Sequence, residues 1–303
     1  MKRLSIFIYS ILVVLCLSQC QSYSPGLYVG EAEHVSHVSD AASSRATPEP
    51  ESLGALMMSP LLERLPVAVP ESAFGAQAWQ EYFGVDVGLE PPFTESALRV
   101  WNGEAPYLLE DETSRQCVKD NHLLTLIPGT VNGEEFTLDK LGDLLLANHG
   151  GHMTAFSGNT NQELGDQSHG FYYYSEYLTN ATRHEPLPGA PYWLLLPKTV
   201  LADSRSKTFS DHKALVSQYS GTGYRLPGVL EVSASLLSHY ARSKERLYPD
   251  DSSSTGLWTY TRCSDVDEAG CPLVVGGFRP AGLGVNLSII DSNYFGVVGC
   301  WKF

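Results

Sequence analysis

Three patterns in the sequence predict an α+β domain built around an antiparallel sheet. Two short apolar runs, 122–127 and 192–196, have the length and composition of buried strands. Between 229 and 240, apolar residues recur at helical spacing and form one stripe. From 282 to 290, apolar residues alternate with small or polar ones, which is typical of a half-buried antiparallel strand. We therefore expect an antiparallel sheet and two main helices.

The N-terminus has the pattern of a secretory signal peptide over residues 1–20. Lys2 and Arg3 precede a run of about 14 mostly apolar residues, and small or polar residues follow it. This run is shorter than the roughly 20 residues that a membrane-spanning helix needs. Residues 17–20 match a bacterial lipobox except at Gln19, so either Cys20 is lipidated or the signal is cleaved just after it. We expect export to the cell envelope, in the periplasm or outer membrane, or secretion.

The chain is strongly acidic, and removal of Lys2 and Arg3 with the signal takes its formal charge from −14 to −16. Nucleic-acid binding requires Lys and Arg to neutralise phosphates, so we expect no nucleic-acid partner. Anionic lipid surfaces repel an acidic protein, so membrane attachment is expected only through a lipid on Cys20. The charge is therefore expected to serve solubility.

Residues 21–77 are predicted to be a flexible, disordered linker. As far as about Glu71 this segment is rich in Ser, Ala, Glu and Pro and poor in large apolar residues. Prolines interrupt the leucines of 59–74, which suggests a short docking segment rather than a domain. The folded α+β domain is expected to span 78–303, which is long enough for one large domain or for a domain with an elaborated arm.

The expected helices follow from periodicity and from one proline. Leucines at helical spacing predict a helix over about 138–145, and a short helix is expected over 211–219. Pro227 suits the first turn of the next helix, where its missing N–H costs no hydrogen bond. Just before that helix, Arg225 is expected either in the core or paired with Glu231.

The C-terminal part of the chain reads as a series of strands. The second apolar run stops at Pro197, and Gly276 and Gly277 suggest a bulge or a close backbone approach. The expected strands of the tail are 258–263, 272–278, 282–290 and 294–302.

Four cysteines remain in the body of the chain once the signal region is set aside. An even count in an exported chain permits two disulfides. We expect one bond between Cys263 and Cys271, which would close a short polar loop. The other would join Cys117 to Cys300 and so tie the start of the domain to its last strand. The alternative is that all four are buried free thiols.

The segment from Ser210 to Tyr240 resembles the helix–turn–helix signature of the formylglycine-generating-enzyme/C-type-lectin-like superfamily. The matching residues are Ala214, Gly223, Tyr224, Arg225, Leu226, Pro227 and Glu231. Gly228 and Val232 stand where that family has Thr and Trp. The Gly-rich tail, which ends in Val297–Phe303, resembles the family's closing strands. The resemblance implies a C-type-lectin-like domain over about 192–303, and such a fold is a platform rather than a function.

A second resemblance covers about 78–303. It is to a family of uncharacterised proteins from environmental, chlamydia-like bacteria. The similar segments are 82–84, 90–92, 122–128, 131–133, 163–165, 192–193, 204–207, 247–248, 258–263 and 275–278. That family implies no known activity, so it adds no site residue.

The resemblance to this superfamily implies a possible enzyme of the formylglycine-generating class. Formylglycine-type catalysis needs two nearby cysteines that bind copper(I) and handle a substrate thiol. Cys263 and Cys271 are the only close pair, and their spacing does not match the family's active-site arrangement. We therefore expect no catalytic residue and no cofactor, and a thiol oxidase of this type remains the alternative.

Two parts of the sequence carry residue types that can bind metal ions. Calcium-dependent sugar binding needs oxygen ligands at defined positions, and the lectin signatures Glu-Pro-Asn and Trp-Asn-Asp are both absent. The acidic stretches 250–251 and 265–268 are more typical of solvated loops. His149 and His152 lack an obvious third ligand. We therefore expect no metal site.

A cluster of tyrosines, Tyr172, Tyr173, Tyr174 and Tyr177, lies in a predicted surface insertion. Exposed tyrosines combine contact area with hydrogen bonding, which suits protein or glycan recognition. The alternative is that they cover the core beneath a long loop. We expect a non-catalytic binding protein that recognises a protein or glycan at the cell envelope. A structural envelope lipoprotein without a specific ligand is a further alternative.

Overall fold

The two apolar runs form the centre of a four-stranded sheet, as the sequence predicts. The computed structural model describes residues 66–110, 112–149, 173–174, 186–187, 189–251, 257–279, 282–288 and 291–303. The strand order is β1 (His122–Ile127), β5 (Tyr192–Pro197), β13 (Cys300–Lys302) and β6 (Tyr224–Arg225). β1 and β5 are antiparallel, with His122 opposite Pro197 and Ile127 opposite Tyr192. Every residue of both strands is buried, which explains their nearly continuous apolar composition.

The tail builds most of a second, five-stranded sheet. Its order is β12 (Phe295–Gly296), β9 (Tyr260–Val266), β10 (Pro272–Arg279), β11 (Gly282–Leu287) and β4 (Tyr173–Tyr174). The three long strands β9, β10 and β11 are antiparallel, whereas the short edge strands β12 and β4 run parallel to their neighbours. The register shifts between Gly276 and Arg279, so the bulge predicted at Gly276 and Gly277 is confirmed.

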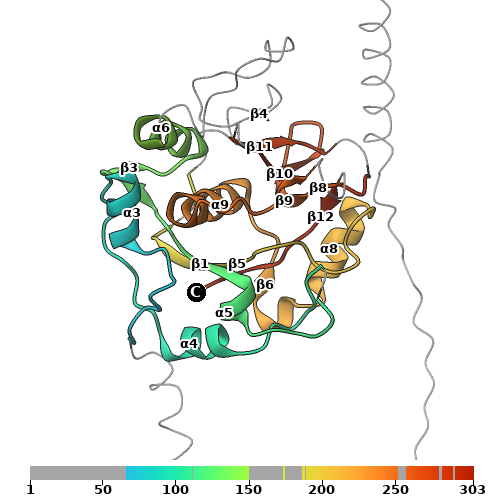
Figure 1. Cartoon of the computed structure of the whole chain (residues 1–303), viewed down its shortest axis with the longest axis horizontal. Coiled ribbons are helices and arrows are strands. Elements are labelled where there is room, and N and C mark those ends of the chain that lie inside the picture. Colours follow the sequence, from blue (N-terminus) through green and yellow to red (C-terminus); the bar gives the residue numbers. More distant parts are fainter. Residues whose placement is uncertain are drawn as a thin grey trace, which may run out of the picture. The chain divides into compact units, whose positions relative to one another are not determined.

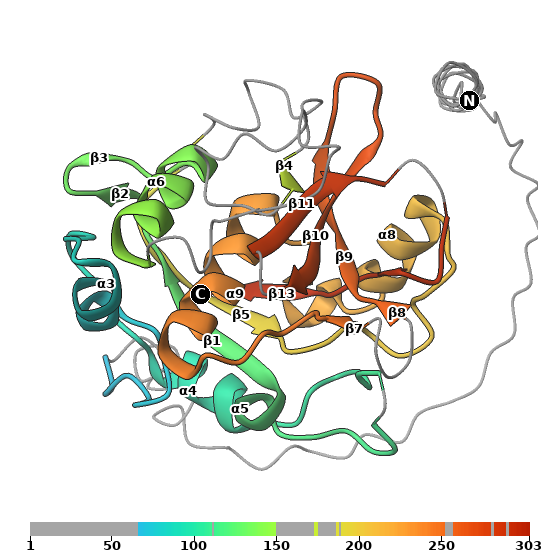
Figure 2. The same cartoon turned by 45° about the horizontal axis from the view of Figure 1, so that its top comes forward.

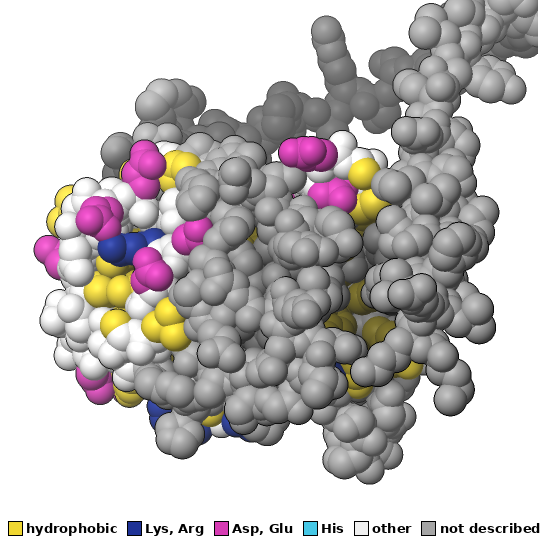
Figure 3. Space-filling model, turned by 90° about the horizontal axis from the view of Figure 1, so that it is seen from above, with side chains coloured by type: hydrophobic (Ala, Val, Ile, Leu, Met, Phe, Trp, Pro, Cys, Tyr) yellow, Lys and Arg dark blue, Asp and Glu magenta, His cyan; other side chains and the backbone are white. Residues whose placement is uncertain are grey.

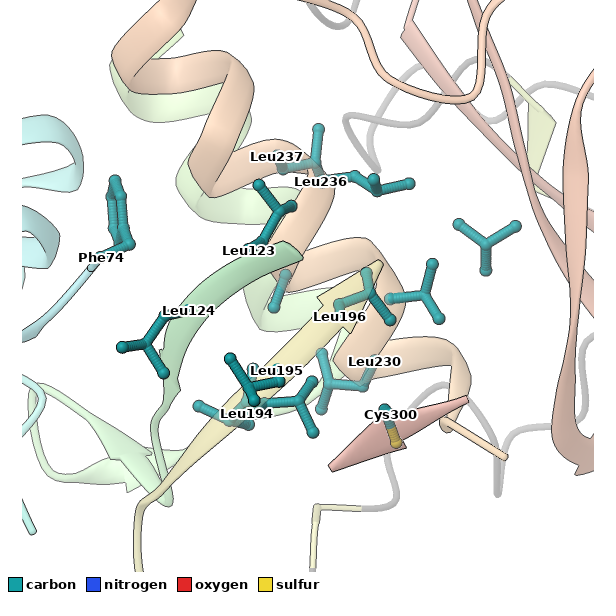
Figure 4. Packing of buried hydrophobic residues seen from close by; sticks show 14 of the residues in the cluster. Phe74, Leu123, Leu124, Leu194, Leu195, Leu196, Leu230, Leu236, Leu237 and Cys300 are labelled. Atoms are coloured by element: carbon teal, nitrogen blue, oxygen red, sulfur yellow. The ribbon is translucent and has the colours of Figure 1, made fainter. Parts of the chain in front are cut away.

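Helix α9 (Val229–Ser243) lies between the two sheets (Figure 1, Figure 2). It contacts β1 and β5 of the first sheet and β9, β10 and β11 of the second. In Figure 4 its leucines meet Leu123 and the leucines of β5. The predicted single apolar stripe was too narrow, because Ser233, Ser235 and Ser238 are buried as well. A helix placed between two sheets is covered on both faces, and these small side chains allow close packing.

Five further α-helices surround the sheets in the part of the chain that the structure describes. They are α3 (Ala76–Phe83), α4 (Glu95–Asn102), α5 (Val118–Asn121), α6 (Leu138–His149) and α8 (Phe209–Ser217). The helices predicted near 138–145 and 211–219 are confirmed as α6 and α8. A 3₁₀ turn, η2 (Ser220–Thr222), follows α8. The expectation of two main helices was therefore too low, while the α+β class with antiparallel sheets is confirmed.

Two short ladders complete the described elements. β2 (Thr130–Val131) pairs with β3 (Glu134–Glu135), and β7 (Asp250–Asp251) pairs with β8 (Leu257–Trp258). Both ladders are antiparallel. The β7–β8 ladder contains the acidic pair that the sequence places in a loop.

The folded unit begins earlier than the sequence predicts. The described chain starts at Pro66, and Phe74 is buried. Phe74 donates its N–H to Leu124 O (2.8 Å) and accepts from Leu126 N (2.9 Å) at the edge of β1. Residues 66–77, which the sequence assigns to the linker, therefore belong to the domain, because they cover part of this edge. The predicted signal peptide 1–20 and linker residues 21–65 lie outside the described residues.

The last predicted strand, 294–302, is two strands in different sheets. β12 pairs with β9 of the second sheet, whereas β13 pairs with β5 and β6 of the first. Val297 and Val298, which lie between them, are fully buried. The single strand was wrong because the chain crosses from one sheet to the other here.

A buried arginine ties the loop before α8 to the second sheet. Arg262 of β9 is 1% exposed and also lies over the ring of Phe295, 5.5 Å from its centroid. Its guanidinium donates to Lys207 O (2.6 Å), Ser288 Oγ (3.0 Å) and Asp291 Oδ1 (2.7 Å). A buried charge of this kind is tolerated only when it is hydrogen-bonded in this way.

Candidate functional site

Half of the tyrosine cluster lies outside the described residues. Tyr172 and Tyr177 are not described, while Tyr173 and Tyr174 form β4 at one edge of the five-stranded sheet. There they pair with Gly284 and Val285 of β11. The predicted role of the cluster in recognition stays a prediction.

The four body cysteines are not at disulfide-bonding distance from one another. Pro272 lies opposite Val266 in the β9–β10 hairpin, and Cys271 O accepts from Asp267 N. This register puts Cys271 beside Asp267, four residues along the chain from Cys263, or about 13 Å at strand spacing. The predicted Cys263–Cys271 bond does not fit this register, since bonded cysteines have Cα atoms within about 7 Å.

The second predicted disulfide, Cys117–Cys300, is not formed either, since both cysteines are free. Cys117 precedes α5, whereas Cys300 lies on β13, between β5 and β6. Burial raises the pKa of the Cys263 and Cys300 thiols, so both stay protonated near neutral pH. Cys20, the predicted lipidation site, lies outside the described residues.

The acidic hairpin between β9 and β10 has structural partners. Asp267 Oδ1 accepts from the backbone N–H groups of Ala269 and Cys271 and so closes the turn. Asp265 Oδ2 accepts from Val229 N (2.9 Å) and caps α9. Within the described ranges, no group of three or more His, Cys, Asp or Glu side chains could hold a metal ion.

Arg225 and Glu231 form a charged cluster at the start of α9. Arg225 binds the Glu231 carboxylate through both terminal nitrogens, and Tyr192 Oη (2.5 Å) and Gly228 N (2.7 Å) donate to it too. Burial would raise the pKa of Glu231, but the hydrogen bond and charge of Arg225 hold it below its ordinary value. The Arg225 side chain is 42% exposed, so the predicted pairing is confirmed and the core position is wrong. The cluster stabilises the start of α9.

A partly open pocket of about 240 Å³ lies where the end of α9 meets β1. Its floor is apolar and consists of Phe74, Trp101, Leu123 and Leu124. Figure 4 shows Leu123 pointing toward α9 and Leu124 pointing away from it. An engineered apolar cavity of roughly 150 Å³ already binds benzene, so this pocket has room for an apolar side chain.

Three cations line the same pocket. They are Lys119 from α5, Lys198 just after β5 and Arg242 from the last turn of α9, and we call the whole site the basic pocket. None of its described lining residues is Asp or Glu. Arg242 donates to Ser72 O (2.8 Å), and Lys198 Nζ donates to Asp120 O (2.8 Å). Both partners are neutral carbonyls, so they leave the positive charge available to an anion.

This concentration of positive charge is unusual for so acidic a chain, whose formal charge is −14. On the face shown in Figure 3, Asp and Glu side chains are spread over the described surface. An acidic partner would be repelled by such a surface and attracted at the basic pocket. The electrostatics of the molecule therefore favour this site for an anionic ligand.

The basic pocket also reaches an open part of the β1 edge. Because Phe74 bonds to Leu124 and Leu126, these two residues direct their backbone groups away from β5. The chain before Phe74 turns away at Ser72, so it does not cover the edge of β1 beyond this point. Leu124 N–H is left without a hydrogen-bond partner among residues 66–303 as far as they are described. Such a group normally binds water or a ligand.

His122, at the start of β1, belongs to a buried polar relay behind the pocket. Its Nδ1 lies 2.5 Å from Asn121 Oδ1, and its Nε2 lies 2.8 Å from Tyr107 Oη. Asn121 Nδ2 donates to Glu112, so the amide oxygen accepts from His122 Nδ1–H. Burial lowers the pKa of His122 to about 3, so the ring is neutral near pH 7. The relay is saturated by these bonds, which favours a structural role.

Two buried histidines predict that stability falls in mild acid. Burial lowers the pKa of His212 to about 4 and that of His122 to about 3. At these two histidines the unfolded chain binds protons from about pH 6.5 downward, whereas the folded chain does not bind them until the pH approaches 4. Stability from these groups is therefore complete above pH 6.5 and declines as the pH falls toward 4. The urea midpoint of unfolding should be lower at pH 5 than at pH 7.

The His122→Gln variant should show a smaller decrease in that midpoint, because it removes one of the two depressed groups. His239→Gln serves as the control, since His239 is partly exposed at the pocket rim. A midpoint that stays constant between pH 7 and pH 5 in the unmodified protein would contradict the interpretation.

The sequence did not reveal the basic pocket. Its cations come from three elements that are far apart in the chain, and each looks like an ordinary solvated charge in its local context. No motif spacing connects Lys119, Lys198 and Arg242. Only the fold brings them beside one apolar floor.

No helix in the described part of the chain is long and apolar enough to cross a membrane. No family model, no curated protein and no solved structure matches the chain.

Proposed function

We propose that this chain is an exported, non-catalytic binding protein of the cell envelope that holds a protein partner in the basic pocket. The observation that carries the proposal is the pocket's combination of an apolar floor with Lys119, Lys198 and Arg242 and no acidic lining residue among those described. An apolar floor suits a side chain, and the cations suit neighbouring carboxylates. The predicted signal peptide, with lipidation of Cys20 or cleavage after it, supports the location.

A protein partner fits the pocket better than a glycan. Sugar rings typically stack on open aromatic faces, whereas Trp101 is 5% exposed and Arg242 lies over the Phe74 ring, 5.1 Å from its centroid. The tyrosines at 172–177 are a second proposed contact, because Tyr173 and Tyr174 lie at a sheet edge.

The scaffold is proposed to be C-type-lectin-like. Two features support this: the Arg225–Glu231 pair at the start of α9 and the β-rich tail that follows it. The formylglycine-type alternative needs reactive thiolates. Cys263 is fully buried and its pKa is raised, which argues against that chemistry.

Charge reversal at the pocket tests the proposal. A library of random linear dodecapeptides is selected on the full chain, and we expect enrichment of peptides that combine Asp or Glu with apolar residues. The Lys119→Glu/Lys198→Glu variant should bind the selected peptides about tenfold more weakly or worse, since each reversal replaces an attraction by a repulsion. Titration by fluorescence anisotropy measures the change.

Lys213→Glu/Lys302→Glu is the matched control, because both lysines are exposed outside the pocket, on α8 and β13, and the two reversals together carry the same change of charge. It should bind like the unmodified chain, and circular dichroism should show all variants folded. Failure to select any peptide, or equal binding by both variants, would contradict the proposal. Binding of an acidic oligosaccharide such as oligogalacturonate, without any peptide, would overturn the choice of a protein partner.

A further inference from the structure

We infer that the basic pocket binds its partner as an extended acidic peptide, which adds a short strand to the open edge of β1 at Leu124. This inference deepens the proposed function and rests on it. It specifies the backbone conformation of the bound segment and the atoms that recognise it.

The edge of β1 is already used in this way by the chain itself. Phe74 lies parallel to β1, opposite Thr125. Its N–H donates to Leu124 O, and its carbonyl accepts from Leu126 N–H. If the strand continued from Phe74 toward the N-terminus, its next carbonyl would accept a hydrogen bond from Leu124 N–H. The chain turns away at Ser72 instead, and the turn is closed by the bond from Ala73 N to Pro70 O (2.9 Å). The strand position beside Leu124 is therefore open, and it coincides with the basic pocket.

A peptide in this position has a backbone partner ready. Its carbonyl would accept from Leu124 N–H, which has none in the described chain, and its N–H would lie beside the His122 carbonyl. The unpaired N–H of a buried residue costs free energy, and a peptide carbonyl that accepts a hydrogen bond from it removes this cost. Leu124 is 2% exposed, so pairing by a ligand would matter more here than on an open edge.

The pocket walls specify the side chains of such a peptide. Successive side chains of a strand point to opposite faces of the sheet. One face meets the apolar floor at Trp101 and Leu124, and the rim carries Lys119 and Lys198. The favoured segment therefore has an apolar residue flanked by Asp or Glu. Arg242 adds charge while it holds Ser72 and Ala73 out of the strand position.

Amide hydrogen exchange at Leu124 tests the strand directly. A peptide obtained from the dodecapeptide selection is added to the full chain, and exchange is followed by NMR or by mass spectrometry with fragmentation. We expect exchange of the Leu124 amide to slow by about tenfold or more on saturation. The Leu126 amide is the internal control, because it already bonds to Phe74 O and should change little.

Single N-methylation along the same peptide supplies the second measurement. Methylation removes one N–H and should lower affinity roughly tenfold at the position facing His122 O, with smaller effects at the positions on either side. Peptides that bind and lose affinity in Lys119→Glu/Lys198→Glu, yet leave Leu124 exchange unchanged and tolerate every N-methyl group, would overturn the strand while keeping the binding function. Absence of any peptide binding would instead refute the proposed function itself.

Discussion

Replacing Gly276 by alanine is expected to destabilise the fold by about 3 kcal/mol or more. Gly276 has φ of 152°, and a Cβ there would lie 2.2 Å from Thr259 O and 2.7 Å from Tyr260 Cα. Both atoms belong to the backbone at the start of the neighbouring strand β9, so the strain is relieved only if the second sheet itself moves. Urea unfolding followed by tryptophan fluorescence should show a lower midpoint with an unchanged slope.

Gly270→Ala is the matched control for this prediction. Gly270 lies in the turn between β9 and β10, has φ of 82°, and has nothing within 4 Å of an added Cβ. Only the left-handed backbone conformation is unfavourable there, at about 1–2 kcal/mol. Equal losses of stability in the two variants would show that the close approach at Gly276 is not what the bulge requires.

Arg262→Met is expected to cost about 3 kcal/mol of stability. Methionine keeps much of the length of the side chain but cannot donate to Lys207 O, Ser288 Oγ or Asp291 Oδ1. Asp291 is 48% exposed and can be hydrated, whereas His212 is fully buried and loses its contact with Arg262. The loss should appear both in the urea midpoint and in the melting temperature.

The control for this variant is Arg115→Met, because Arg115 is exposed in the segment before α5. Substitutions at such surface positions usually change stability by no more than about 0.5 kcal/mol. If Arg262→Met lost less than about 1 kcal/mol, the arginine network would not be what joins the loop before α8 to the second sheet.

The elements that the sequence predicted correctly are those with strong local patterns. β1 and β5 are apolar runs with clear stops, and α9 has apolar residues at helical spacing. Pro227, predicted in the first turn of that helix, lies instead just before its N-cap residue, Gly228. The pairing of Arg225 with Glu231 was also predictable, since both residues lie within one turn of the start of α9. Each of these inferences depends on residues that are close in the sequence.

The errors share one cause, which is packing between distant segments. The sequence around Phe74 is typical of a linker, but in the structure Phe74 pairs with the edge of β1. The segment 294–302 was predicted as one strand, because the pattern of its apolar residues does not show that its two halves pair with different sheets. The Cys263–Cys271 bond looked favourable by spacing, whereas the hairpin register separates the two residues along the strands.

Local periodicity and turn chemistry decided the class of the domain, its main strands and its central helix, because hydrophobic burial and backbone geometry act over a few residues. The tertiary structure alone decided the strand order, the two-sided burial of α9 and the site. Lys119, Lys198 and Arg242 become one basic pocket only when α5, β5 and α9 meet, and Leu124 N–H is left open only because the chain turns away at Ser72. Such long-range packing leaves no trace in the spacing of the residues, which is why the site could not be found before the fold was known.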